Sequence, residues 1–482
     1  MIGSKILTID GTQFLQGMSS SDNTADGGFS NRSINVNLLA EPGVLNATAE
    51  FTNNLSSSVA GTIIATAGDA NSLGNRRYVV TTTDVAGGNG KYYTIASDYT
   101  TTLRQTDSTN TYIPENSDTC QFQLALYTTT ETDITYTTGG DLASQKVDWW
   151  TGAGPTGQAQ SVLNSGNRHP MIVYENALWI GDKNKLHKWD GTTPSNAFLL
   201  LSTEQSITAL GIDPGTGKML ISVTEGTNAA NTHSKMAKIL TYDGFSPKPT
   251  RAVIVDDTVN AIYPVGGTVY MTYGQRLGYW TGSGISFLRK LKNVTLAATD
   301  LVYKERITNI GNTLYVVDGS VILAYGEVKY GRKVFYYPLQ NNFSADVFTA
   351  IFNIGSNQLA MSYSTAKLYT YDVTSTSTIN SAGVVFYSNQ IEFPQPAIIR
   401  TVYLEYSDNI AAAATPATIS LIDENGTATS LEALTNGASG NIRRLTVHGP
   451  DKKVMSTQVL YTGSTIVAGL KRIIIRYDTV EN

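Results

Sequence analysis

The sequence predicts an all-β protein, and three observations support this fold class. Only 15% of the 482 residues are charged and glycine occurs 43 times, while the segments between apolar runs are rich in Thr, Ser and Asn, which disfavours helices. A pattern of short apolar strand, polar turn and second strand returns along the middle of the chain. The last part of the chain alternates apolar and polar residues between Gly, Asn and Asp turns.

Residues 1–75 are expected to form an extended N-terminal arm. They include GMSSSDNTADGGFSNRSINVNLLAEPGVL at 17–45, a stretch rich in Ser, Asn, Asp and Gly. So few apolar side chains are too few for a core of their own. We therefore expect the arm to gain its order from partners and to contribute more to assembly than to folding.

Residues 76–380 are expected to form a β-propeller, because one sequence unit recurs there. Each clear copy is an apolar strand of about five residues, a tight polar turn and a strand that ends in an aromatic residue. The clear copies lie at 174–191, 265–282, 309–326 and 354–372. A more divergent copy with a longer hairpin loop lies at 216–244, and two poorer copies at 76–107 and 120–152. With the divergent copy counted among the clear ones, five clear and two poorer copies predict six or seven blades.

The spacing of these copies matches the length of one propeller blade. Their closing positions lie 39, 53, 38, 44 and 47 residues apart, at Gly152, Gly191, Gly244, Gly282, Gly326 and Val373. The mean of about 44 residues is the length of a four-stranded blade. Such a sheet is apolar on both faces, so blades must pack face to face around an axis. We therefore expect burial of four inner-strand residues, Trp179, Tyr270, Tyr315 and Leu359.

Residues 385–482 are expected to form a C-terminal β-sandwich. Their apolar runs include VVFYSNQIEF, RTVYLEY and RIIIRYD, separated by turn-forming residues. None of these runs repeats the blade pattern. A second all-β domain is therefore predicted after the propeller.

The charge and the ends of the chain exclude some classes of protein. A net charge of −5 without a Lys and Arg cluster argues against generic or sequence-specific nucleic-acid binding. The start, MIGSKILTIDGTQF, lacks the apolar core of a secretory signal, and no apolar run is long enough to cross a membrane, so we expect a soluble protein made in a cytosol. A single cysteine, Cys120, forms no internal disulfide and is expected to be buried.

The sequence offers few residues or motifs of the kinds that bind metals or catalyse reactions. The four histidines are scattered without metal-ligand spacing and are expected at the surface or at strand edges: His169, His187, His233 and His448. The nucleophile elbow, the Walker phosphate loop, the dinucleotide fingerprint and the sialidase Asp box are all absent from the sequence. No catalytic, cofactor-binding or metal-binding residue is predicted, and the chain is not expected to be an enzyme.

Two short motifs have structural explanations. WDG at Trp189, with YDG and WTG in other copies, is expected to be a turn in which Asp-Gly forms the bend and the ring packs on the next blade. The acidic segments 22–28 and 423–426 offer carboxylates to calcium but lack the alternating spacing of a calcium loop. Neither segment is predicted to bind a metal.

The segment GGFSNRSINVNLLAEPGVLNAT at 27–48 resembles the start of propeller proteins in tailed-bacteriophage virions. The residues that carry this resemblance are Gly27, Gly28, Asn31, Pro42 and Gly43. The propeller followed by a C-terminal sandwich is similar to tail nozzle proteins and to tail-tip or vertex propellers. The resemblance implies a structural virion protein and supplies no catalytic residues.

This resemblance implies a place and partners. The chain would lie in the virion tail after assembly in the bacterial cytoplasm, as a nozzle or hub that forms a ring with its own copies around the DNA exit channel. Neighbouring virion proteins, such as an adaptor or other tail components, would contact it, and so could the host surface.

Two other functions remain open from the sequence. One is a receptor- or glycan-binding propeller with aromatic residues on exposed loops: Trp149, Trp150, Tyr279 and Trp280. The other is a hydrolase or lyase, which the absence of a His or carboxylate constellation disfavours.

The two ends of the chain carry opposite charge. Residues 1–75 have a balance of −4 and residues 441–482 a balance of +4. Opposite charge at opposite ends suits a head-to-tail contact between copies, in which the acidic arm lies on the basic sandwich of the next copy. An equal alternative is that both charged segments simply face solvent and do not contact each other.

Overall fold

The structure of the chain is a computed structural model. The described residues are 4–14, 16, 30–38, 41, 43–47, 52–53, 63–67, 77–81, 91–95, 104–105, 120–124, 134–138, 147–150, 155–160, 170–190, 193–225, 237–291, 306–319, 321–329, 332–340, 348–355, 357–363, 367–374, 384–410, 417–431, 440–446, 453–463 and 469–480. Contacts divide the chain into two units. We call Thr52–Ser320 with Phe343–Thr370 the repeat unit, and Met1–Phe51, Val321–Asn342 and Tyr371–Asn482 the terminal unit.

In the repeat unit, the described residues form six four-stranded antiparallel sheets. Five are built from consecutive strands: β6 (Ile63–Ala67), β7 (Arg77–Thr81), β8 (Lys91–Ile95) and β9 (Arg104–Gln105); β10 (Cys120–Leu124), β11 (Ile134–Thr138), β12 (Val147–Trp150) and β13 (Pro155–Gln160); β14 (Met171–Tyr174), β15 (Ala177–Asp182), β16 (Lys185–Trp189) and β17 (Pro194–Leu200); β18 (Gln205–Asp213), β19 (Lys218–Glu225), β20 (Ala237–Tyr242) and β21 (Arg251–Val255); β22 (Val259–Val265), β23 (Thr268–Tyr273), β24 (Arg276–Trp280) and β25 (Ile285–Lys290). The pair β26 (Ile307–Ile310) and β27 (Thr313–Asp318) follows them.

The sixth sheet joins distant parts of the sequence. It contains β30 (Phe348–Gly355), β31 (Gln358–Tyr363) and β32 (Lys367–Asp372), and its fourth strand is β5 (Thr52–Asn53). Tyr369 lies opposite Asn53, and Thr370 lies opposite Thr52. A strand that precedes the first sheet in sequence therefore completes the last one.

Tight turns with a left-handed backbone connect the first two strands of several sheets. Glu175 and Asn176 have φ of 46° and 53° between β14 and β15, and Gly266 and Gly267 have φ of 54° and 83° between β22 and β23. Two consecutive residues with positive φ make the hairpin turn whose twist matches that of the strands. This local geometry fixes which residues of each strand face the neighbouring sheet.

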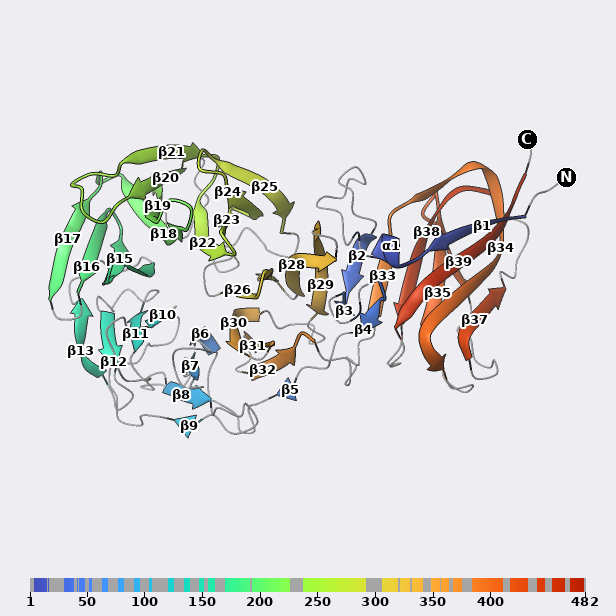
Figure 1. Ribbon diagram of the computed structural model, residues 1–482, viewed down its shortest axis with the longest axis horizontal. Helices are drawn as coiled ribbons and strands as arrows, with labels where there is room; N and C mark the ends of the chain where they lie inside the picture. Colours follow the sequence, from blue (N-terminus) through green and yellow to red (C-terminus); the bar gives the residue numbers. More distant parts are fainter. Residues whose placement is uncertain are drawn as a thin grey trace. The chain divides into compact units, whose positions relative to one another are not determined.

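Apolar side chains of successive sheets pack together. One buried cluster joins Trp179 of β15 with Met219 and Tyr242 of the next sheet, and another joins Ile239 of β20 with Met271 of β23. The first strands of the sheets also contact one another: β6 with β10, β10 with β14, β14 with β18, β18 with β22, β26 with β30, and β30 with β6. Figure 1 shows the sheets of this unit following one another around a common centre. The repeat unit is propeller-like.

The prediction of buried inner-strand residues is confirmed. Trp179, Tyr270, Tyr315 and Leu359 are each at most 1% exposed. Glycine allows a close approach of two first strands, since a Cβ at Gly211 in β18 would collide with the side chain of Ile262 in β22. The sheets therefore pack tightly at both their apolar faces and their first strands.

The terminal unit is also built almost entirely of strands. They are β1 (Ser4–Ile9), β2 (Ser30–Ile34), β3 (Val36–Asn37), β4 (Asn46–Ala47), β28 (Val321–Lys329), β29 (Arg332–Gln340), β33 (Val384–Ser388), β34 (Ile391–Ile410), β35 (Ala417–Asp423), β36 (Ala428–Leu431), β37 (Gly440–Thr446), β38 (Lys453–Gly463) and β39 (Leu470–Thr479). The four-residue α1 (Gly11–Phe14) is the single helix of the described part of the chain. No helix there is long and apolar enough to span a membrane.

Most of these strands pair in the order β1-β39-β34-β38-β33-β2-β29-β28. The 20-residue β34 changes partners along its length: Ile391–Ile398 pairs with β38, and residues from Ala397 onward pair with β39 and then with β37 as well. Burial alternates along β35 and β39, as expected for strands with one face in a core.

Residues 1–75, expected to form an arm, contribute strands to both units. β1 pairs with β39 and β2 with β33, whereas β5 and β6 belong to sheets of the repeat unit. The boundaries 1–75, 76–380 and 385–482 remain predictions. What the strand pairing adds is that parts of the N-terminal segment are bonded within the same chain.

Replacing Trp179 by alanine should lower the free energy of unfolding by roughly 3 to 5 kcal/mol, because it leaves a large cavity between two sheets. The matched control is Leu200→Ala in the same sheet, where the side chain is 64% exposed and the cost should be below about 1 kcal/mol. Urea denaturation followed by circular dichroism measures both. Equal costs for the two variants would contradict the assigned register.

Candidate functional site

The closing turns of the sheets are the first recurring polar feature. We use this name for the turn after the third strand of a sheet, where an aromatic residue is followed by Asp or Thr. Asp190 Oδ1 accepts a hydrogen bond from the Thr193 N–H (2.7 Å), and Asp372 Oδ1 accepts one from the Thr374 N–H (2.8 Å). A carboxylate that accepts a backbone N–H a few residues ahead stabilises a turn. These aspartates therefore have a structural role.

Asp243 makes the most extensive of these turns. Its Oδ1 accepts the backbone N–H groups of Phe245 (2.9 Å) and Ser246 (2.8 Å), and its Oδ2 accepts the Ser246 hydroxyl (2.6 Å). Gly244 has φ of 83°, the left-handed conformation that glycine adopts most easily. The hydrogen bond from the Ser246 hydroxyl, followed by the backbone bonds from Ser246 and Phe245, lowers the pKa of Asp243 to about 2.

The aromatic rings beside the closing turns are buried, as the sequence predicts, but against the preceding sheet rather than the next one. The Tyr242 ring packs edge-on against Trp179 of the preceding sheet, with centroids 5.9 Å apart, and Trp280 joins a cluster with the preceding sheet. The expectation that these rings pack on the next blade is therefore wrong for Tyr242. Burial, with smaller effects from Asp243 and Tyr174, raises the pKa of Tyr242 to about 12.

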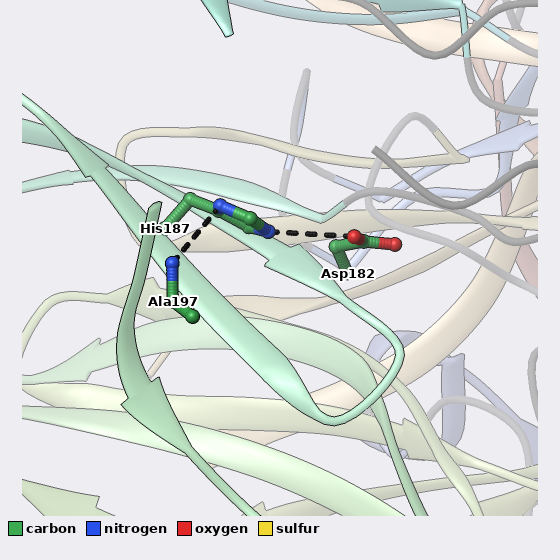
Figure 2. A network of polar contacts seen from close by, with 3 residues as sticks. All are labelled: Asp182, His187 and Ala197. Carbon is green, nitrogen blue, oxygen red and sulfur yellow. Dashed lines mark hydrogen bonds and ion pairs between the residues drawn. The ribbon is translucent and has the colours of Figure 1, made fainter. Parts of the chain in front are cut away.

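A buried histidine and aspartate form the second polar feature, shown in Figure 2. His187 Nε2 lies 3.3 Å from Asp182 Oδ2, and the two side chains are 2% and 0% exposed. Asp182 ends β15 and His187 lies in β16, on either side of the hairpin turn at Lys183 and Asn184. The pair therefore links the two strands next to their turn.

An irregularity in β17 supplies the second partner of His187. The ladder between β16 and β17 shifts register between Leu186 and Lys188, and Ala197 has φ of 50°. This bulge brings the Ala197 N–H to His187 Nδ1 at 3.3 Å. Because a backbone N–H only donates, Nδ1 is the acceptor, and the ring proton on Nε2 is donated to the Asp182 carboxylate.

This geometry suits a structural role rather than catalysis. A histidine that acts as a general base needs one ring nitrogen facing the substrate, as in triads where an aspartate holds the other nitrogen. In His187 the backbone occupies the nitrogen that would have to face a substrate, and the ring is buried. The pair therefore joins β15, β16 and β17 without presenting a reactive atom to solvent.

Polar contacts also join the first strands of neighbouring sheets. Thr208 Oγ1 in β18 donates to the Val259 carbonyl of β22 (2.8 Å), so the Ser222 hydroxyl, also 2.8 Å from Thr208 Oγ1, is the donor to it. Tyr263 in β22 donates to Asn309 Oδ1 in β26 (3.1 Å), and burial raises its pKa. These bonds add directional contacts to the apolar packing.

The same arrangement continues from β26 to β30. The Asn353 N–H donates to Thr308 Oγ1 (3.1 Å), and its side-chain amide donates to the Asn309 carbonyl (2.9 Å). Together with Thr208 and Tyr263, these residues fix neighbouring first strands relative to one another.

The structure places some of the residues singled out in the sequence. The prediction that His187 lies at the surface or at an edge is wrong, because the ring is buried between two strands. His169, His233, His448 and the segment 22–28 lie outside the described residues. Asp423 Oδ1 accepts the N–H groups of Asn425 and Thr427 and thus caps a turn. No group of three or more metal-ligating side chains is found among the residues whose side chains are described.

The aromatic residues proposed for a glycan site lie on strands. Tyr279 and Trp280 belong to β24 and Trp149 and Trp150 to β12. Trp280 is 9% exposed and belongs to a buried cluster that includes Val253, Met271 and Tyr273, so it is not available on an exposed loop. Cys120 begins β10, and its burial stays a prediction.

Replacing Asp182 by alanine should lower the free energy of unfolding by about 1 to 3 kcal/mol, because it leaves the buried Nε2–H of His187 without its carboxylate. Asp190→Ala in the same sheet is the matched control, since Asp190 is exposed and its loss should cost about 1 kcal/mol or less. Urea denaturation measures both variants. If the two cost the same, the buried pair does not stabilise the sheet.

The Asp243 turn should respond to acid. A carboxyl whose pKa is lowered from 3.8 to about 2 in the folded protein contributes stability above pH 3.8 that is lost as pH falls toward 2. Carbon NMR of the Asp243 carboxyl should give a pKa near 2, and Ser246→Ala, which removes the largest cause, should raise it toward 3.8. An unchanged pKa in Ser246→Ala would show that the hydroxyl bond is not the cause.

Comparisons with known proteins identify no family for this chain. No family model matches it, and no curated protein does. Among solved structures, a chain of the one titled "Crystal Structure of Mitotic Checkpoint Complex" is similar, with 9% identity, a TM-score of 0.42 and coverage of 68% of this chain and 95% of that chain. A likeness of this size supports no conclusion about what this chain does.

Proposed function

We propose that this chain is a structural protein and not an enzyme. The observation that carries the proposal is His187, since this buried histidine has Asp182 on one ring nitrogen and a backbone N–H on the other. The aspartates of the closing turns likewise hold backbone groups. In the described part of the chain, the buried pair and the aspartates of the closing turns therefore stabilise the fold.

The proposal extends to the architecture. We infer seven blades for the repeat unit: the six four-stranded sheets and one that includes β26 and β27. The contacts between first strands, with the Tyr263–Asn309 bond between β22 and β26, support a closed ring. We also infer that the strands from Val384 to Thr479 form a two-layered sandwich, because β34 changes partners along its length.

The biological setting that we propose is the tail of a bacteriophage virion. It rests on the resemblance of residues 27–48 to the start of virion propeller proteins, carried by Gly27, Gly28, Asn31, Pro42 and Gly43. In this setting the chain forms a ring with its own copies around the DNA exit channel, as a nozzle or hub. It contacts neighbouring virion proteins such as an adaptor, and it could also contact the host surface.

Particles assembled with and without an intact gene for this chain test the proposal. We expect the chain in purified particles at a fixed number of copies, and particles without it should fail to retain DNA or to complete the tail. Mass spectrometry and electron microscopy measure these outcomes. The fold-matched control is a chain carrying Leu200→Ala, which should enter particles normally because Leu200 is exposed.

Two results would contradict this function. One is absence of the chain from particles that are complete and infectious. The other is turnover of a host polysaccharide by the purified chain, which would favour an enzyme. Binding to host glycans without any incorporation would favour the receptor-binding alternative, although the burial of Trp280 argues against it.

A further inference from the structure

One face of the terminal unit combines arginines with exposed isoleucines. Four strands lie side by side there in the order β1-β39-β34-β37. Residues directly opposite one another on paired strands point to the same side of a sheet. The register of the strand pairs therefore identifies the members of each face.

Three rows of residues on the outer face form what we call the arginine face. Asp478, the next residue of β39 on this side, is paired with Arg400 (2.8 Å). The register aligns Ile442, Glu405 and Arg472 in one row, Arg444, Tyr403 and Ile474 in the second, and Thr401, Arg476 and Ile6 in the third. The alternate residues of the same strands form the opposite face, where Val402, Leu404, Ile473 and Ile475 are fully buried. One side of this sheet thus covers a core while the other is open.

Two isoleucines on the arginine face are unusually exposed for apolar side chains. Ile6 is 68% exposed and Ile442 is 54% exposed, and the three arginines are exposed as well. Arg472 is paired with Glu405 through Nε (2.8 Å) and a terminal nitrogen (2.6 Å), and Arg476 Nε donates to Ser4 Oγ (2.8 Å). Among the described residues, Arg444 and Arg476 have no carboxylate partner, so the face carries positive charge.

The charge of the rest of the chain is complementary. Residues 441–482 carry +4 and the whole chain carries −5, so residues 1–440 carry −9. Arginine and exposed apolar side chains together are typical of protein interfaces, whereas isoleucines between the arginines offer nothing to a phosphate backbone. The chemistry of the face therefore fits an acidic protein surface better than a nucleic acid.

We propose that the arginine face binds the acidic part of a second copy of this chain. The arginine face is basic and the rest of the chain is acidic, so the contact joins unlike surfaces. Such a contact is head-to-tail and closes into a ring when the rotation allows it. This inference rests on the proposed structural function, because it names the surface through which copies would meet. It also changes the expected contact: β1, part of the predicted acidic arm, is paired with β39 in its own chain and helps to form the basic face.

Self-association of the purified full chain tests this surface. Sedimentation velocity over a range of concentrations should show association at low salt that weakens as salt rises, because surface charges are screened over about 10 Å at 0.1 M salt. Reversing Arg444→Glu and Arg476→Glu together should weaken association about tenfold or more. The matched control is Arg251→Glu with Lys290→Glu, two exposed cations of the repeat unit, which should leave association unchanged.

A second variant keeps the test independent of charge. Ile6→Thr with Ile442→Thr retains β-branched residues on the strands and removes exposed apolar surface, so it should weaken association without altering its salt dependence. Circular dichroism melts of all variants check that the fold is intact.

Three results would overturn the proposal: a wild-type chain that stays monomeric at all concentrations, association that ignores the arginine reversal, or equal loss in the control. Loss of single-stranded DNA binding in Arg444→Glu with Arg476→Glu, with association unchanged, would assign the face to nucleic acid instead. Incorporation into particles is measured separately, so the proposed function can stand when this surface fails.

Discussion

The repeat unit depends on the need of each four-stranded sheet to bury two apolar faces. A single sheet of this kind leaves both faces in water, and a neighbour on each side removes them from it. The cluster that contains Trp179 and Tyr242 is shared by two sheets, as is the one that contains Ile239 and Met271. The close approach of Gly211 to Ile262 and the polar bonds of Thr208 and Asn353 follow from this packing, because they lie where the first strands meet.

Local features of the sequence predict local features of the fold well. Short apolar runs separated by Gly-Gly or similar turns specify hairpins, and the burial of Trp179, Tyr270, Tyr315 and Leu359 follows from their place in such runs. The pairing of β1 with β39 could not be predicted, because these strands are separated by most of the chain and periodicity says nothing about a distant partner. The same holds for β5 and β32.

The candidate site shows where sequence reasoning fails at the level of single residues. His187 lies in a strand between Lys185, two residues before it, and Lys188, directly after it, a context typical of the surface. Its bond to the Ala197 N–H depends on an irregularity that inserts two extra residues into β17 and on the left-handed backbone of Ala197, neither of which the residue types in β17 indicate. Asp182 is the one available signal, since a carboxylate that ends an otherwise apolar strand requires a buried partner.

The pairing of β5 with β32 has a consequence for how the protein is made. More than 300 residues separate the two strands, so β5 leaves the ribosome long before its partner exists. At about 5 to 20 residues per second, the wait is roughly 15 to 60 s. During this time, the sheets already synthesised expose the apolar faces and strand edges that later sheets cover, which is when chaperones protect a nascent chain from aggregation. Chaperones thus protect the chain for longer before β5 can pair with β32 than before any hairpin of the repeat unit forms.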